Sequence, residues 1–385
     1  MTRVLLVLPS PPLPFGGAAA RWFHVLLRGL ADRGAEVVAV CCSGGAEDDA
    51  QAAALHSGSA TLHFFPPTPA SLLAKINTLR RPHSYAYSRD MATAVRRLLD
   101  ESWDFVRFET HFSGWVSDRP PTNVELSVHQ LHAIDMREDR PQSFADRLLH
   151  RRLLHCERAL LRRFDQVSTL THRLADEVRR IHPAAKVRVT PMTIDPSLYP
   201  FEAPSAPLAV PTIGLVGTFR WGPTLSAARK LLDDVWPKVE RRTPGTKLLL
   251  VGRGAGEALQ GRQLGAGVEV HSDVAEVLPY FRRLNALVYL PTVGSGMKVK
   301  VMEALALGTP VITNREGAEG LPESVARAVT VPSDRAAVDR VTQIIRGDHP
   351  YDAAALRRDL FEHLSPEACV SRFLAKPTAE TSRAQ

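Results

Sequence analysis

Residues 291–310 read Pro-Thr-Val-Gly-Ser-Gly-Met-Lys-Val-Lys-Val-Met-Glu-Ala-Leu-Ala-Leu-Gly-Thr-Pro, and this stretch decides the fold. A strand is expected to end at Pro291, a loop with Gly294 and Gly296 follows, and a helix is expected to reach Gly308. The helix therefore starts at the carboxyl end of a strand. Its free N–H groups and the positive end of its dipole suit an anion such as a phosphate. The stretch thus predicts a strand–loop–helix unit with an anion site at its turn.

Charged residues within this helix point to the same site. The helix is apolar on nearly every side, through Met297, Val299, Val301, Met302, Ala304, Leu305 and Ala306. It must be buried, yet it carries Lys298, Lys300 and Glu303, residue types that are almost never buried without a partner. A structural Lys300–Glu303 pair is one interpretation. Because that pair leaves Lys298 unexplained, we favour a site in which both lysines bind a diphosphate and Glu303 accepts hydrogen bonds from ribose hydroxyls.

The alternation of strand and helix extends outward from this stretch to both ends of the chain. In the second half, strands are expected at 212–216, 247–251, 268–271, 286–290, 310–313 and 329–331, with a helix near 224–241. In the first half, they are expected at 4–8, 35–40, 60–65, 105–108, 124–128 and 166–170. Continuous apolar runs such as Val4–Leu8 are typical of parallel strands buried on both faces. The pattern predicts an α/β protein with two Rossmann-like, doubly wound parallel-sheet domains facing a central cleft.

A proline-rich segment separates the two halves. Six prolines lie between positions 191 and 211, where helical periodicity is weak. We expect an N-terminal domain at 1–195, a linker at 196–211, a C-terminal domain at 212–365 and a C-terminal helix and tail at 366–385. Two domains also suit a length of 385 residues.

Composition places the chain among soluble globular proteins. Its net charge of +7 is compatible with anionic partners, and its four cysteines lack the spacing of a disulfide framework or a zinc site. No apolar run reaches the roughly 18 residues of a membrane span. The first residues indicate a strand and not a signal peptide. We therefore expect a cytoplasmic protein.

Several segments resemble one known family. The run Gly294-Ser-Gly-Met-Lys-Val-Lys-Val-Met-Glu-Ala-Leu-Ala-Leu-Gly-Thr-Pro-Val-Ile-Thr-Asn314, with Gly317-Ala-Glu-Gly-Leu321 after it, resembles the donor motif of the GT-B retaining glycosyltransferases of family 4 (glycosyl transferases group 1). Further segments resemble other parts of that family, namely Gly16-Gly17, 156–171, 189–195 and 215–221. The resemblance thus extends over most of the chain.

The resemblance implies a nucleoside-diphosphate sugar as donor, no obligatory metal ion or other cofactor, and retention at the anomeric carbon. It implies that the backbone of Gly16 and Gly17 faces the donor phosphates. The residues that it assigns to donor binding in the second half are Gly294, Ser295, Gly296, Met297, Lys298, Lys300 and Glu303.

Two departures from the family pattern affect this site. The family's Glu-x7-Glu motif has its first glutamate where this chain has Ser295, which removes an expected contact to sugar hydroxyls. Thr218 occupies the position of a usual arginine, with Arg220 two residues on. We expect Lys298 and Lys300 to supply the phosphate charge, assisted by Arg220.

Histidines mark the acceptor side of the predicted cleft. His111 follows the strand that ends near Glu109, and His129 and His132 follow the strand at 124–128. Strand carboxyl ends are where cleft residues lie. The family often has a histidine there that contacts the donor sugar, and His129 matches it best, so His129 and Lys298 are our catalytic candidates. His111 and His132 are acceptor-side candidates, and a purely structural role is the alternative for all three histidines.

The expected helix at 146–164 has an apolar face opposite a face rich in arginine. The apolar stripe consists of Leu149, Leu153, Cys156, Leu160 and Phe164. The helix either packs its apolar face on a sheet or docks on anionic lipid as a peripheral membrane contact, and we favour the former.

The sequence therefore favours an enzyme that moves a hexosyl group from a nucleoside-diphosphate sugar to a hydroxyl of a small-molecule, lipid or glycan acceptor. The alternative is a non-catalytic nucleotide-sugar-binding partner of another glycosyltransferase, which Ser295 and Thr218 keep open. Nucleic-acid binding is not expected, because no recognised module accompanies the arginines.

Overall fold

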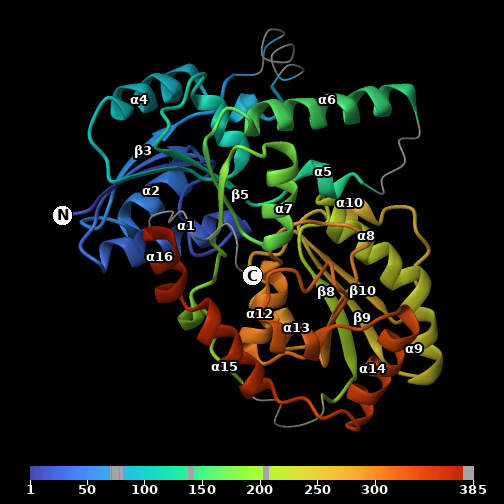
Figure 1. Cartoon of the computed structure of the whole chain (residues 1–385). Helices are drawn as coiled ribbons and strands as arrows, with labels where there is room; N and C mark the ends of the chain where they lie inside the picture. The colour runs from blue at the N-terminus through green and yellow to red at the C-terminus, as the bar shows by residue number, and fades with distance from the viewer. Residues whose placement is uncertain (70, 72–77, 79–80, 138–142, 203–207, 376–385) are drawn as a thin grey trace. The chain divides into compact units, whose positions relative to one another are not determined.

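Each half of the chain forms a parallel sheet of short strands. The computed structural model describes residues 1–69, 71, 78, 81–137, 143–202 and 208–375 (Figure 1). The chain divides into two compact units, one formed by Met1–Asp195 with Pro366–Gln385 and the other by Pro196–Ser365. The polypeptide therefore returns to its first unit at Pro366.

The first unit contains a seven-stranded parallel sheet in the order β3-β2-β1-β4-β5-β6-β7. Its strands are β1 Arg3–Leu8, β2 Glu36–Cys42, β3 Thr61–Phe65, β4 Phe105–Phe108, β5 Val124–Val128, β6 Gln166–Thr169 and β7 Lys186–Val189. Val4 to Leu8 are fully buried, as a strand covered on both faces requires. The strand order reverses between β1 and β4. The carboxyl ends of these two strands flank a switch point, where open α/β sheets bind ligands.

The second unit contains a five-stranded parallel sheet in the order β10-β9-β8-β11-β12. Its strands are β8 Thr212–Val216, β9 Lys247–Gly252, β10 Val268–Ser272, β11 Ala286–Tyr289 and β12 Val311–Thr313. Here the order reverses between β8 and β11. The loops that follow these two strands, near 217–221 and 290–298, therefore flank the second switch point.

Helices connect the strands in both units. In the first unit they are α1 Ala18–Ala31, α2 Ala46–Leu55, η1 Ser84–Ala86, α4 Arg89–Leu99, η2 His111–Val116, α5 His132–Asp135, α6 Phe144–Leu161, α7 His172–Ile181 and α16 Pro366–Leu374. In the second they are η3 Pro196–Leu198, α8 Gly222–Lys230, the π turn Leu231–Val235, α9 Trp236–Arg242, α10 Ala255–Ala258, α11 Leu278–Phe281, α12 Val299–Leu307, α13 Glu323–Val329, α14 Asp334–Arg346 and α15 Ala353–Leu364. No helix in the described ranges is long and apolar enough to span a bilayer.

Two strand predictions were wrong. The edge strand β7 was not predicted, because Lys186 and Arg188 interrupt the apolar pattern of its four residues. A strand was expected at 329–331. There α13 continues to Val329, and Thr330 makes only an isolated bridge with Thr313.

The C-terminal helix α16 packs on α1 of the first unit. Figure 1 shows α16, near the red end of the chain, beside the blue α1. The two helices approach closely at Gly29, where a Cβ would lie 2.6 Å from Cγ2 of Val370. Glycine is therefore required at this crossing. At the unit boundary, η3 and the residues up to 202 belong to the second unit, and residues 203–207 and 376–385 of the expected linker and tail lie outside the described ranges.

Helix α6 differs from the expected sheet-packed helix in its first half. Its buried residues are Cys156, Glu157, Leu160 and Leu161. By contrast, Phe144, Leu148 and Leu149 are 80%, 58% and 51% exposed. The predicted apolar stripe is thus buried only toward the end of the helix, and Leu149 is not part of the core.

Candidate functional site

The loop after β11 carries two lysines to the switch point of the second sheet. Gly294 and Gly296 have positive φ angles of 149° and 77°, and a Cβ on Gly294 would lie 3.0 Å from Pro223. Both positions therefore favour glycine. Helix α12 begins at Val299 and not at Met297, with Lys298 as its N-cap and no side chain capping its N-terminus. The first N–H groups of α12 thus lack a side-chain cap at the turn where the sequence predicted an anion.

Lys298 folds its side chain back over this loop. The residue is 3% exposed, and its Nζ donates to the carbonyl oxygens of Ser295, at 3.3 Å, and of Gly296. Nζ also lies 6.0 Å from the ring centroid of Trp221, the residue that precedes α8. The ammonium group is therefore held between the two helix N-termini at the switch point.

Lys300 places a second ammonium group against aromatic faces. Its Nζ donates to Thr224 Oγ1 at 3.0 Å and lies 4.3 Å from the ring centroid of Tyr289 and 4.9 Å from that of Trp221. Gly217 makes room for the stem, because a Cβ there would lie 2.6 Å from Cε of Lys300. Burial, followed by the charge of Lys298, lowers the pKa of Lys300 to about 7. Within the described part of the chain, Lys300 has no carboxylate partner.

Glu303 makes a hydrogen bond with Tyr199 and not with Lys300. Its carboxylate is buried, and Oε1 accepts a hydrogen bond of 3.0 Å from the hydroxyl of Tyr199. The alternative of a structural Lys300–Glu303 pair is wrong for these two described residues, because Lys300 bonds to Thr224 instead. Lys300 and Glu303 therefore do not neutralise each other as a pair.

The other predicted donor residues fall into two groups. Ser295 and Met297 are buried in the loop beside the lysines. Arg220 instead forms an exposed ion pair with Glu257 of α10, with Nη2 3.0 Å from Oε2. None of the contacts among the described residues joins Arg220 to Lys298 or Lys300. The assistance of Arg220 in phosphate binding therefore stays a prediction.

Chemically, this arrangement suits a compact polyanion. It combines two ammonium groups at a switch point with the N-termini of α8 and α12, neither of which has a side-chain cap. Aromatic faces and a hydroxyl stabilise a cation but leave its charge uncompensated. A diphosphate would supply that compensation through charge-assisted hydrogen bonds.

In the first unit, the predicted glycine loop follows β1 at that sheet's switch point. Gly16 has a φ of 81°, and Gly17 is the N-cap of α1 without a side-chain cap. Nothing lies within 4 Å of a Cβ built on either residue. The loop thus leaves open space next to a helix N-terminus.

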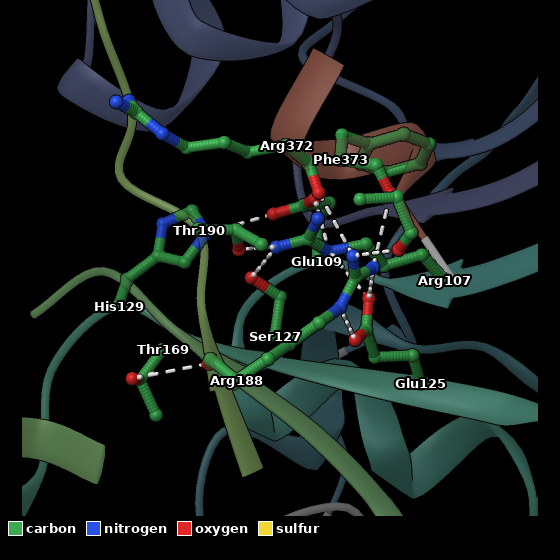
Figure 2. A network of polar contacts seen from close by, with 11 residues as sticks. Arg107, Glu109, Glu125, Ser127, His129, Thr169, Arg188, Thr190, Arg372 and Phe373 are labelled. Atoms are coloured by element: carbon green, nitrogen blue, oxygen red, sulfur yellow. Dashed lines mark hydrogen bonds and ion pairs between the residues drawn. The ribbon is translucent and has the colours of Figure 1, made fainter. Parts of the chain in front are cut away.

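His129, which follows β5, is held in place by the buried carboxylate of Glu109, which follows β4. Its Nε2 lies 2.7 Å from Oε2 of Glu109, and Oε1 of Glu109 lies 3.0 Å from Nε of Arg107 (Figure 2). Burial opposes ionisation of Glu109, but Arg107 and His129 outweigh it and hold its pKa below the usual value. Since a carboxylate can only accept, His129 donates through Nε2–H, and Nδ1 is the ring nitrogen on the side away from this contact.

The network behind Glu109 reaches the C-terminal helix. Arg107 donates to Ser127 and Thr190 and lies with its guanidinium 4.9 Å from the ring centroid of Phe373. Figure 2 also shows Arg188, which pairs with Glu125 and donates to backbone carbonyl groups of α16, among them that of Phe373 at 3.0 Å. The end of α16 thus covers the buried charges that support His129.

His111 and His132 lie together and not with His129. Their ring centroids are 6.2 Å apart, and His111 is only 2% exposed. Glu157 of α6 lies beside both, with Oε2 3.5 Å from Nε2 of His111 and 2.7 Å from the backbone N of His132. The structure therefore separates the three predicted histidines into two environments.

Most side chains that contact the predicted site residues could not be predicted from the sequence. Thr224, Trp221 and Tyr289 around Lys300, and Tyr199 beside Glu303, have no local signal because each comes from another element. Arg107 did leave a signal, since a charged residue inside an otherwise apolar strand requires a buried partner.

The two parallel-sheet units, with two lysines at a switch point of the second sheet, define a GT-B type α/β protein, and the comparisons agree. Residues 210–347 match the family described as "Glycosyl transferases group 1", and residues 16–193 match the "Glycosyl transferase 4-like domain". The chain belongs to the group 1 glycosyltransferases, a family of transferase enzymes.

One curated relative is 2-deoxystreptamine N-acetyl-D-glucosaminyltransferase from Streptomyces fradiae. It is 32% identical over 265 residues, which cover 60% of this chain and 59% of the relative. The aligned part is thus less than two thirds of the relative's length.

Solved structures are similar over nearly the whole chain. Sucrose-phosphate synthase from Thermosynechococcus elongatus superposes with a TM-score of 0.69 at 17% identity, covering 97% of both chains. HepE from Anabaena, in complex with UDP-glucose, superposes with a TM-score of 0.66 at 14% identity, covering 97% of this chain and 99% of HepE. These likenesses confirm the predicted fold class.

Proposed function

We propose that this protein transfers a hexosyl group from a nucleoside-diphosphate sugar to a hydroxyl group of a small-molecule, lipid or glycan acceptor. The reaction retains the anomeric configuration and needs no metal ion at the diphosphate, as in family 4. Four free, buried cysteines support a reducing compartment, and we place the reaction in the cytoplasm.

The observation that carries this proposal is the ammonium group of Lys300, which lies at a sheet switch point without a carboxylate partner in the described chain. Lys298 and Lys300 bind the diphosphate, together with the N-H groups that open α12. The same charges stabilise the diphosphate as it leaves, which is where negative charge develops in the reaction. A metal ion is therefore not required for charge compensation there.

The remaining roles are proposed from the resemblance to the family. Glu303 is buried near the lysines on the same helix and accepts from the ribose hydroxyls, in addition to or in place of Tyr199. Gly16 and Gly17 present backbone N–H groups to the donor phosphates. His129, oriented by Glu109, contacts the transferred sugar through Nδ1.

The named relatives suggest which substrates to test first. HepE is bound to UDP-glucose, and the relative from Streptomyces fradiae is named for N-acetylglucosamine and 2-deoxystreptamine. We propose a uridine diphosphate sugar as donor. UDP-glucose and UDP-N-acetylglucosamine, each with 2-deoxystreptamine as acceptor, form the first panel, and product formation is measured by mass spectrometry.

Calorimetric titration of UDP tests the site itself. Replacing Lys300 with Met removes a charge-assisted hydrogen bond worth about 1.5–3 kcal/mol. UDP should then bind roughly ten- to a hundredfold more weakly. Lys298→Ala should weaken binding in the same direction, whereas the control Lys247→Ala, at the amino end of β9, should not. Unchanged affinity in both site variants would falsify the assignment.

A second partner is suggested by the exposed start of α6. Phe144, Leu148 and Leu149 are exposed among the arginines 147, 151 and 152, which are also exposed. Apolar side chains flanked by cations are typical of helices that lie on anionic membranes. We propose a peripheral membrane contact here. Leu149→Glu should reduce co-sedimentation with anionic vesicles, and equal sedimentation of both proteins would remove the proposal.

A further inference from the structure

Three potential metal ligands meet in the first unit, outside the site described above. His111 opens η2 directly after β4, His132 opens α5 shortly after β5, and Glu157 projects from α6. One ligand atom from each of these residues lies within 4.8 Å of the others. The cluster is enclosed, since His111 and Glu157 are buried and His132 is half-buried.

The imidazoles of this cluster lack ordinary hydrogen-bond partners. Both ring nitrogens of His111 and Nε2 of His132 are buried, and none of them makes a hydrogen bond within the described ranges. The contact of 3.5 Å between His111 Nε2 and Glu157 Oε2 is too long for a good hydrogen bond. Orphaned buried polar atoms cost free energy and call for an explanation such as a missing ion.

Backbone N–H groups hold the carboxylate of Glu157 in the cluster. The two Glu157 oxygens accept backbone N–H groups of His132 and Ala133 at 2.7 and 2.9 Å, which fixes the carboxylate and leaves lone pairs for a metal.

We propose that His111, His132 and Glu157 bind a divalent transition-metal ion, for which zinc is the best match. Two imidazoles and one carboxylate form a recognised zinc ligand set, with metal–ligand bonds of about 2.0–2.2 Å. The ligand atoms now lie within 4.8 Å of one another, so binding requires the side chains to move closer around the ion. The backbone N–H groups of His132 and Ala133 already orient the carboxylate of Glu157, which is the kind of support that metal-binding side chains usually have.

A fourth ligand is available next to the cluster. The ring of His83 is nearly parallel to that of His132, with centroids 6.3 Å apart, and lies 4.4 Å from that of Phe112. His83 and Thr110 are two of the three non-glycine residues with positive φ in the described chain, at 62° and 64°. Such strain persists where the surroundings impose it, often at ligand sites. A turn of His83, or a water molecule, completes a four-coordinate site.

The ion would bind in the first unit, whereas the diphosphate lysines belong to the second, so the two proposals are independent. An ion here ties α6 to the loops after β4 and β5. It would stabilise the native first unit, because the ligands meet only after folding.

The test measures metal binding and not turnover. Purified protein is treated with EDTA, desalted and incubated with Zn²⁺ or Co²⁺, and metal content is then measured by mass spectrometry. We expect one ion per chain after a second desalting, the visible absorption bands of four-coordinate Co²⁺, and a higher Tm that EDTA reverses. Wild-type protein that stays metal-free after incubation would overturn the proposal, whatever the donor site does.

Variants separate this site from adventitious binding by other histidines. His132→Ala removes a half-buried ligand and should weaken binding by more than the roughly 10–100-fold that loss of an outer-shell partner costs. His63→Ala, at an exposed position of β3, is the matched control and should keep the ion. If His132→Ala fails to fold, Glu157→Gln provides the same test, because its oxygen still accepts one backbone N–H. Binding equal to wild type in the ligand variants would also overturn the proposal.

Discussion

Lys300 has an unusual environment for a lysine, and this environment makes donor binding pH-dependent. Its pKa is lowered to about 7 by burial and by Lys298, so the free protein loses this proton as the pH rises through neutrality. A bound diphosphate favours the charged form, and binding therefore takes up a proton. We expect the affinity for a uridine diphosphate sugar to fall between about pH 7 and about pH 9, by at most about tenfold per unit.

Calorimetry with the intact nucleotide sugar measures this dependence, because its diphosphate does not titrate in this range. Lys300→Arg is the control, since arginine stays charged and should flatten the profile. A wild-type affinity that does not change with pH, or a profile unchanged in Lys300→Arg, would contradict the role of Lys300.

Glu109 supports both the fold and the orientation of His129, and two variants separate these roles. Glu109→Gln leaves Arg107 with Glu125, 3.6 Å from its Nε, as its remaining carboxylate, so it should lower the free energy of unfolding by less than the roughly 3–5 kcal/mol of a fully broken buried pair. His129→Ala leaves the Arg107–Glu109 pair intact and should cost less stability. Both should reduce kcat, by roughly tenfold or more, because His129→Ala removes the ring and Glu109→Gln removes the charged acceptor that orients it. Urea unfolding and steady-state rates measure the two effects, and equal stability losses would argue against this division.

Single residues were predicted where their own type carried the signal. Lys298 and Lys300 stand in an apolar segment, so their residue type alone predicted that each would need a polar partner, and an anion there stays a prediction. Their partners required the folded structure. Tyr199 lies 104 positions from Glu303 in the sequence, so no local pattern pairs their side chains.

At the scale of elements, α16 anchors the first unit although it follows the second in the chain. Phe373 is 1% exposed and covers Arg107, while Arg188 holds carbonyl groups at the end of the helix. Phe373→Ala should lower the free energy of unfolding by about 3–5 kcal/mol, as for other buried phenylalanines. Leu149→Ala, which shortens an exposed side chain of α6, is the control and should be nearly neutral. Similar urea midpoints for the two variants would show that α16 contributes little.

Element prediction followed the strength of the apolar pattern. Strands such as β1, with five fully buried residues in succession, were predicted because a parallel strand covered on both faces must be apolar throughout. The edge strand β7 does not have to be apolar throughout, and its lysine and arginine interrupt the pattern that predicts a buried strand. In the first half of α6, burial was predicted but the apolar side chains are exposed. An apolar stripe does not specify which surface will cover it.

At the scale of the whole molecule, alternating strands and helices predicted two parallel sheets, and the order of the strands explains the sites. In each parallel sheet, the order of the strands reverses once, between β1 and β4 in the first unit and between β8 and β11 in the second. The predicted glycine loops follow β1 and β11, which are strands at these reversals. Sequence patterns located the loops. The strand order explains why the proposed donor-binding residues lie in these loops and not in others, because ligands bind where the order of the strands reverses.

Donor hydrolysis distinguishes whether the protein acts as an enzyme or only binds the donor. In the proposed site, Lys298 and Lys300 stabilise a leaving diphosphate more strongly than the bound nucleotide sugar, because charge on the leaving oxygen grows as the bond breaks. The protein without acceptor should therefore slowly hydrolyse the UDP-sugar that binds best, and Lys300→Met should reduce that rate by roughly ten- to a hundredfold. The first sugar released should keep the anomeric configuration of the donor, which NMR detects before mutarotation. A non-catalytic partner of another transferase would bind the same nucleotide with the same lysine dependence but release no sugar. Donor binding without any hydrolysis or transfer would therefore favour that alternative, while an inverted product would exclude the retaining mechanism and leave the diphosphate site intact.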